Sequence, residues 1–341
     1  PAFKAADARF GMIGTALTLV VAFACGAFGY TRIRAGFKAR TRVERVTMSV
    51  LLLASLMAVL TTFGIVASLI VESGRFFSAV SPVDFLFGLH WNPTAEGGPD
   101  LGENFGAIPL FWGTIFIGAI IAMIVAIPLG LMSAIYLTQY ANASFRAWVK
   151  PLLEILAGVP TVVYGYFAAL TVAPLVRDLA VQLGMENPST ESALAAGLVM
   201  GVMIIPFVSS MADDSIAAVP QAMRDGSLAM GATTSETIRR VLVPAALPGI
   251  VAGVMLAISR AIGETMIVVM AAGAAANLSA NPFASMTTVT FQIVALLTGD
   301  QDFDTPKTMS AFALGLVLFI VTLLLNIVAL RVVKRFREAY D

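Results

Sequence analysis

The amino-acid sequence predicts an all-α integral membrane protein. Hydrophobic residues make up 58% of the 341 residues and charged residues 12%, whereas soluble domains contain roughly 45–50% apolar and about 25% charged residues. Seven apolar runs approach or exceed the roughly 20 residues with which a helix crosses a bilayer. Lysine and arginine gather in alternate connecting segments, as in multi-pass membrane proteins. We therefore expect about seven transmembrane helices.

The predicted spans follow one another along the chain. They cover residues 10–30, 46–71, 108–137, 152–176, 193–212, 245–276 and 309–333. Basic residues follow the first run, which favours a real span over a cleaved signal. The third and sixth runs are longer than a bilayer requires and contain prolines, so we expect tilts or kinks there. Because the chain begins with Pro1, we expect the numbering to start inside a longer precursor.

Basic residues also set the expected orientation, because lysine and arginine near span ends are retained in the cytoplasm. The segment after the first span holds Arg32, Arg34, Lys38, Arg40, Arg42 and Arg45. Alternation then places further basic residues inside, namely Arg146, Lys150, Arg224, Arg239, Arg240, Arg331, Lys334, Arg335 and Arg337. The alternate segments are acidic, with Glu72, Asp84, Glu96, Asp100, Glu103, Asp178, Glu186, Glu191, Asp300, Asp302 and Asp304. We expect an outer N-terminus and an inner C-terminus.

The largest inner segment, 213–244, is too long for a tight turn. Pro220 introduces a short helix, and Gly231 is a plausible stop. Thr233, with a glutamate three residues later, matches a capping box that opens a second helix. Pro244 is expected to break the backbone before the sixth span.

Apolar side chains on the first of these short helices have two interpretations. Ala222, Met223, Leu228 and Met230 fit a helix that docks into a groove of another protein. They equally fit a helix that lies on the membrane surface or packs on the spans of its own chain. The pattern leaves both open.

Two full charges, Arg260 and Glu264, interrupt the sixth apolar run. An arginine near the bilayer centre costs about 2.5–3.5 kcal/mol on insertion scales. Spaced four residues apart, the two side chains would share a helix face and could form a structural ion pair. Replacing such a pair by apolar residues is often neutral, however, and an arginine fork suits phosphate oxygens. We favour a pathway role and add the neighbouring Thr265 as a candidate.

The stretch "AGVPTVVYGY" offers a similar choice. Pro160 would interrupt the hydrogen bonds of the fourth span, which makes it a broken helix beside a pathway or a kinked packing helix. In a broken helix beside a pathway, the hydroxyls of Thr161 and Tyr164 could contact the transported molecule. The sequence does not decide between the broken helix and the kinked packing helix. We expect the glycines to serve close helix packing, namely Gly158, Gly165, Gly197, Gly201, Gly249 and Gly253.

The sequence does not contain the residues that several kinds of functional site require. No G-x-x-x-x-G-K-[ST] loop is present, so the chain is not expected to bind or hydrolyse ATP. Cys25 and His90 are the only cysteine and histidine, and we expect no metal and no cofactor. An enzymatic function would have to use Glu264 as its acid or base without a nucleophile or a metal site, and we therefore discount it. An ion-coupled carrier working through Arg260 and Glu264 is physically allowed, although it would not need a structured inner loop.

Three stretches carry a family resemblance. Asp225, Gly226, Ser227, Gly231, Val241, Val243 and Pro244 resemble the EAA signature of importer-type ABC permeases, with Asp-Gly-Ser in place of Glu-Ala-Ala and Val243 where leucine is usual. The stretches "EILAGVPTVVYGYF" and "SRAIGETMIVVMAAG" resemble phosphate-uptake (Pst) permeases, and the continuation "GETMIVVM" looks more like the C-type subunit than its A-type partner. The resemblance covers about 111–335.

This resemblance implies an importer-type, MetI-like permease core with a cytoplasmic coupling helix, in a bacterial inner membrane. The coupling residues would be Ala222, Asp225, Gly226, Ser227, Gly231 and Pro244. Expected partners are a second permease (PstA-like), two ATP-binding subunits (PstB-like) and an extracytoplasmic phosphate-binding protein (PstS-like). The cargo would be phosphate, or phosphonate or another oxyanion.

The chain is expected to divide into four parts. These are an N-terminal span with a basic linker (1–45), a second span with an outer loop (46–109), the permease core (110–335, with the coupling loop at 213–244) and a cytoplasmic tail (336–341).

Overall fold

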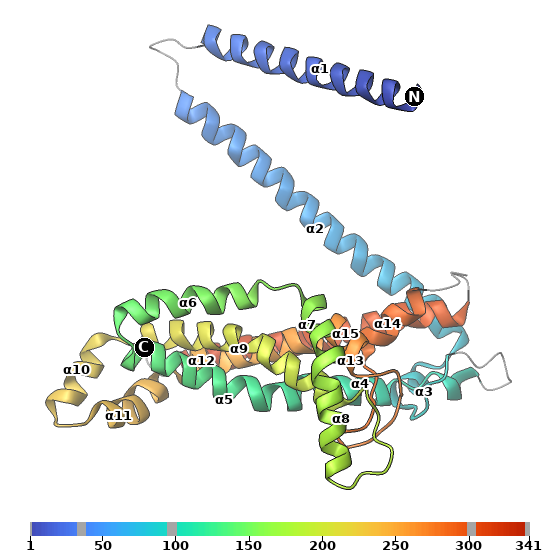
Figure 1. Cartoon of the computed structure of the whole chain (residues 1–341), viewed down its shortest axis with the longest axis vertical. Helices are drawn as coiled ribbons and strands as arrows, with labels where there is room; N and C mark the ends of the chain where they lie inside the picture. The colour runs from blue at the N-terminus through green and yellow to red at the C-terminus, as the bar shows by residue number, and fades with distance from the viewer. Residues whose placement is uncertain (1, 33–38, 94–100, 299–304, 338–341) are drawn as a thin grey trace. The chain divides into compact units, whose positions relative to one another are not determined.

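The computed structural model describes residues 2–32, 39–93, 101–298 and 305–337. In these residues it is built from helices joined by turns and by longer irregular segments, including 183–192 and 272–288 (Figure 1). Seven helical stretches are long and apolar enough to cross a membrane, which agrees with the predicted number. They are Gly11–Thr31, Arg40–Ala79, Ile108–Tyr140, Thr161–Gln182, Ala193–Ala217, Thr234–Ile262 and Pro306–Val332.

The chain forms two units, Pro1–Ile65 and Val66–Asp341. The first unit contains α1 (Ala2–Arg32) and most of α2 (Ala39–Ala79). Its described apolar side chains, such as Phe23 and Phe63, are exposed. A helix that is apolar on all faces is typical of a membrane span.

The second unit is a helical bundle around α9. It also contains α3 (Pro82–Phe87), a 3₁₀ turn (Leu101–Asn104) and α14 (Val289–Leu297). Its longest helical stretches are of two kinds. Two are made of consecutive helices, α4 (Ile108–Thr114) followed by α5 (Ala122–Ile135), and α7 (Thr161–Phe167) followed by α8 (Ala173–Gln182). The others are α9 (Ala193–Ala217), α12 (Val243–Ile262) and α15 (Pro306–Arg337). Shorter helices are α6 (Ala143–Ala157), α10 (Gln221–Ala229), α11 (Thr234–Thr237) and α13 (Met266–Ala271). Single π-helical turns extend several of them, at Ile115–Ile121, Tyr136–Tyr140, Ala168–Val172 and Ile238–Leu242.

Glycines bring the central helices of this unit together, as predicted. A Cβ on Gly201 would lie 2.8 Å from the Val125 Cβ on α5, and one on Gly253 would lie 2.6 Å from the Met211 Cβ on α9. A Cβ on Gly165 would likewise lie 2.9 Å from the carbonyl oxygen of Met266. Such distances leave no room for a side chain, so α5, α9 and α12 can run side by side (Figure 1). Gly197 and Gly249 also pack closely, whereas a Cβ on Gly158 would meet only carbonyls of its own turn.

Two predicted spans are divided differently in the structure. The fourth breaks at 158–160, where Pro160 is the N-cap of α7, so α6 is a separate helix and the membrane-length stretch begins at Thr161. The sixth was expected to continue to 276, but α12 ends at Ile262 and Gly263 caps it.

The expected break at Pro244 was wrong. A helical stretch continues from Thr234 to Ile262, with a π-helical turn directly before the proline. Proline is tolerated there because the first turn of α12 needs no N–H from it.

Candidate functional site

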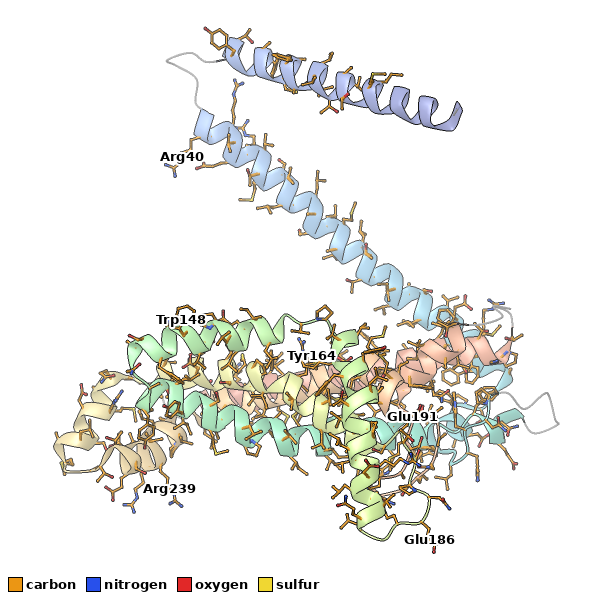
Figure 2. All side chains as sticks on the ribbon, viewed as in Figure 1. Arg40, Trp148, Tyr164, Glu186, Glu191 and Arg239 are labelled. Carbon is orange, nitrogen blue, oxygen red and sulfur yellow. The ribbon has the colours of Figure 1, made fainter. Side chains whose placement is uncertain are left out.

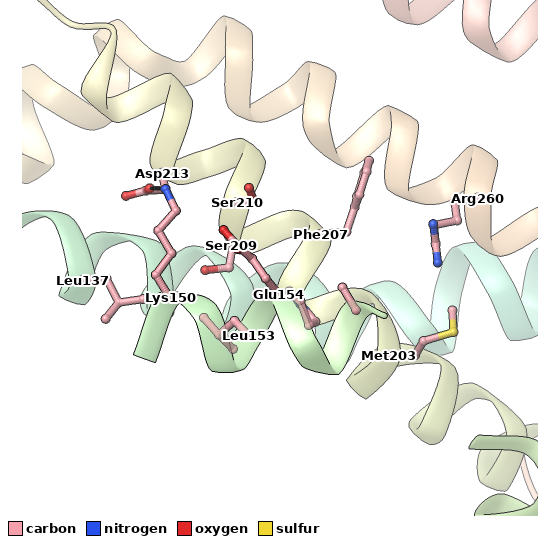
Figure 3. Close-up of a pocket in the computed structure, with 12 residues that line it drawn as sticks. Leu137, Lys150, Leu153, Glu154, Met203, Phe207, Ser209, Ser210, Asp213 and Arg260 are labelled. Carbon is pink, nitrogen blue, oxygen red and sulfur yellow. Dashed lines mark hydrogen bonds and ion pairs between the residues drawn. The ribbon is translucent and has the colours of Figure 1, made fainter. Parts of the chain in front are cut away.

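Arg260 lies in the last turn of α12 and lines a cavity of about 240 Å³ between α6, α9 and α12. Its side chain is exposed, and in the described part of the chain no carboxylate lies within ion-pair distance of it. Figure 3 shows Arg260 at one end of the lining residues and Lys150 with Asp213 at the other. The cavity therefore contains a cation that is free to meet an anion.

Glu264 does not share a helix face with Arg260, so that expectation was wrong, and no ion pair joins the two residues in the described structure. Because α12 ends at Ile262, Glu264 lies beyond the helix that carries Arg260. Its Oε1 accepts hydrogen bonds from the backbone N–H groups of Met266 at 3.0 Å and Ile267 at 3.4 Å. The carboxylate thus satisfies free donors at the start of α13, as an acidic residue near a helix N-terminus commonly does.

The hydroxyls predicted for the pathway lie outside the residues that line this cavity. The Tyr164 hydroxyl is buried and donates to the Leu156 carbonyl at 2.8 Å, which joins the two sides of the break between α6 and α7. The Thr265 hydroxyl lies 3.4 Å from the Gly263 carbonyl. Thr161 is half-buried in the first turn of α7. Of the predicted pathway residues, only Arg260 lines the cavity.

Sequence reasoning missed the other polar residues of the cavity, which are Lys150, Glu154, Ser209, Ser210 and Asp213. Glu154 carried a usable signal, because it is a carboxylate within the predicted fourth span. The serines carried none, since two hydroxyls on an apolar helix are common.

An ion cluster fixes α6 to α9 beside the cavity. The Asp213 side chain, 8% exposed, accepts from the Arg146 guanidinium at 2.9 and 3.1 Å and from the Lys150 Nζ at 2.7 Å. The hydrogen bond to Asp213 raises the pKa of Lys150, and burial opposes this rise. One carboxylate and two cations leave the cluster with one excess positive charge.

Both predicted helices of segment 213–244 begin where expected, although the second, α11, continues into α12 instead of ending before it. Pro220 is the N-cap of α10, and Gly231 follows that helix with a φ of +85°, a conformation that favours glycine. Thr233 and Glu236 form the complete capping box of α11. The Ser227 and Thr237 hydroxyls lie 2.9 Å apart and join the two segments.

The α10 helix has no buried residue. Met223 and Leu228 are 38% and 41% exposed, and Met230, which follows the helix, is 90% exposed. Ala222, Asp225 and Gly226 are exposed as well. Within the described residues, no group of three or more histidine, cysteine or acidic side chains could hold a metal ion.

Comparisons with known proteins decide the family. Residues 126–338 match the family described as "Binding-protein-dependent transport system inner membrane component". The chain belongs to this family. A probable ABC transporter permease protein, YqgH of Bacillus subtilis, is 32% identical over 247 residues, covering 72% of this chain and 76% of the relative. The phosphate transport system permease protein PstC of Mesorhizobium japonicum is 32% identical over 293 residues, covering 81% and 85%.

A solved structure agrees with the fold. A bacterial alginate ABC transporter in complex with an alginate pentasaccharide-bound periplasmic protein has a chain that superposes with a TM-score of 0.56 at 15% identity, covering 86% of this chain and 96% of that one. The chain is therefore a PstC-like, multi-pass inner membrane component of a binding-protein-dependent transport system. It is a transport subunit rather than an enzyme.

Proposed function

We propose that this chain is the permease subunit of an ABC importer that moves inorganic phosphate across the inner membrane, driven by ATP hydrolysis in partner subunits. The observation that carries this proposal is Arg260, an exposed arginine in the last turn of α12, a helix whose other residues from Val243 to Ile262 are uncharged. The PstC-type relatives, named as phosphate transport permeases, supply the identity of the cargo.

The physical argument concerns the cost of that charge. An arginine in the bilayer is expensive unless it faces a partner or a water-filled cavity. Arg260 has no ion-pair partner in the described residues and lines a cavity. Its planar guanidinium offers several N–H donors to the oxygens of a passing phosphate. A pathway role is therefore favoured over a structural pair with Glu264, because that carboxylate caps α13.

Energy coupling is assigned to α10. The coupling residues would be Ala222, Asp225, Gly226, Ser227, Gly231 and Pro244, of which the first three are exposed on α10. An exposed amphipathic helix with methionine and leucine side chains suits a hydrophobic groove. We assign that groove to one of two PstB-like ATP-binding subunits. A PstA-like permease would complete the pathway, and a PstS-like protein would deliver phosphate from outside.

The orientation follows from the charges at the two ends of the second unit. Figure 2 shows Arg239 near α10 and α11, and Glu186 and Glu191 towards the other end, around α8. By the positive-inside rule, α10 and the C-terminus lie in the cytoplasm. The N-terminus of this chain then lies outside.

Uptake by the reconstituted complex tests this function. Proteoliposomes that contain both permeases, the ATP-binding subunits and the binding protein should accumulate phosphate when ATP is inside. Uptake should stop without ATP, even under an imposed proton gradient, and phosphonate should compete weakly. Proton-driven uptake without ATP, or preferred uptake of phosphonate, would contradict the proposal.

A further inference from the structure

The cavity between α6, α9 and α12 contains more polar groups than Arg260 alone (Figure 3). Its volume of about 240 Å³ corresponds to roughly eight water molecules at about 30 Å³ each. Apolar side chains, including Met203 and Phe207, form much of the wall. The few polar groups therefore decide what the cavity can hold.

Ser209 is the buried donor of this wall. The residue is 3% exposed and its side chain has no hydrogen-bond partner in the described part of the chain. By comparison, the hydroxyl of Ser215 on α9 donates to the Met211 carbonyl at 2.6 Å, and that of Thr114 on α4 donates to the Leu110 carbonyl at 2.8 Å. The Ser209 Oγ is not among the fully enclosed oxygens without a partner in the described residues. Because Ser209 lines the cavity, its hydroxyl is open to the cavity and can donate to a group held there.

The charges of the wall divide into a paired and an unpaired set. Lys150 and Asp213 form an ion pair at 2.7 Å, so each charge of the paired set already has a partner. Arg260 and Glu154 have no ion pair in the described residues, yet both line the cavity. A guanidinium only donates hydrogen bonds, whereas a carboxylate only accepts them. The open cavity thus presents donors from Arg260 and from the hydroxyls of Ser209 and Ser210, together with the Glu154 carboxylate, which only accepts.

This combination fits one class of anion. A phosphate that still carries a proton has oxygens that accept and a hydroxyl that donates. Sulfate has only acceptors, so the Glu154 carboxylate would repel it without a compensating bond. We propose that this cavity is a binding subsite for a protonated oxyanion on the translocation route, where Arg260 and Ser209 donate and Glu154 accepts from its hydroxyl. The subsite rests on the proposed function and assigns Glu154 as a residue that selects phosphate over sulfate.

Protection of a cysteine from alkylation tests the subsite directly. Ala157→Cys places a thiol in the wall without touching the polar groups, in a chain that also carries Cys25→Ala. Ala147→Cys, on the same helix but outside the cavity, is the matched control. The complete transporter, without binding protein and in zwitterionic lipid and detergent, is treated with neutral N-ethylmaleimide.

Phosphate at about ten times its Kd occupies roughly 90% of sites, so labelling of Ala157→Cys should slow about tenfold. Sulfate should slow it little, and the control should not respond to either anion. Glu154→Gln should allow sulfate to protect, because an amide also donates. Arg260→Gln should abolish protection by both anions.

Three results would overturn the subsite: no protection by phosphate, equal protection by sulfate in the unchanged site, or equal slowing of the control. Protection by added phosphatidylglycerol instead of phosphate would assign the cavity to a lipid headgroup and also overturn it. ATP-driven phosphate uptake by the unsubstituted complex is measured in parallel. Uptake without protection refutes the subsite alone, whereas absent uptake refutes the proposed function.

Discussion

Asp213→Asn should destabilise the transporter by removing the charge that holds α6 against α9. Removing one partner of a buried ion pair costs about 3–5 kcal/mol, whereas an exposed pair contributes about 0.2–1 kcal/mol. The Asp213 side chain is 8% exposed, but those of Arg146 and Lys150 are each 37% exposed. Both cations would regain water, so we expect a loss of about 2 kcal/mol, between these limits.

Thermal unfolding of the purified, assembled complex measures this loss. A change of about 2 kcal/mol should lower Tm by roughly 4 °C. The neighbouring, exposed Asp214→Asn is the control and should change stability by less than about 0.5 kcal/mol. In a double-mutant cycle, Lys150→Gln and Asp213→Asn should couple by about 1 kcal/mol. An unchanged Tm for Asp213→Asn, or equal effects of the two aspartate substitutions, would refute the reasoning.

The pH dependence of this cluster has a defined sign. The hydrogen bond to Asp213 raises the pKa of Lys150 above its usual value of 10.5. Stabilisation from the pair is therefore fully present below pH 10.5 and is lost as pH rises through the higher folded pKa. The difference in Tm between the unsubstituted complex and Lys150→Gln should stay constant around neutral pH and shrink only in strong alkali. A difference that disappears on mild acidification through lysine titration would contradict this sign.

Further predictions concern docking, packing and topology. Met230→Glu should release the ATP-binding subunits while membrane insertion is retained, because Met230 is 90% exposed and loses no contact within the described chain; a complex that co-purifies and transports normally would argue against docking. Gly201→Leu should destabilise by about 1–3 kcal/mol through overpacking against α5, whereas Gly74→Ala, with no other atom within 4 Å, should be tolerated in the same unfolding assay. Thiols at Thr41→Cys and Val83→Cys should be labelled from the cytoplasm and from outside, respectively, and the reverse pattern would overturn the orientation.

Hydropathy predicted the number of spans because a bilayer requires long apolar helices whatever their packing. Local signals also located the break at Pro160 and the capping box at Thr233, since each depends on residues a few positions apart. The end of α12 at Ile262 was missed because the sixth span was predicted from apolar length alone, which extends to 276. No local pattern indicated that Glu264 would accept hydrogen bonds from the first N–H groups of α13 instead of sharing a helix face with Arg260.

The polar half of the candidate site could not be predicted for a different reason. Lys150 and Asp213 are 63 positions apart in the sequence, and their contact depends on how α6 packs on α9. Glu154 on α6 and Arg260 on α12 line the same cavity, although they are far apart in the sequence. Periodicity within one helix carries no information about such contacts.

ATP-dependent phosphate uptake by the reconstituted complex with Arg260→Gln tests the central claim most directly. The account predicts that this variant inserts, assembles and binds its ATP-binding subunits like the unsubstituted protein, yet loses uptake, because the side chain packs against no carboxylate in the described residues and is needed by the anion. Arg260→Lys, which keeps the charge without the planar fork, should retain part of the uptake. Full phosphate uptake by Arg260→Gln, with assembly unchanged, would contradict the account.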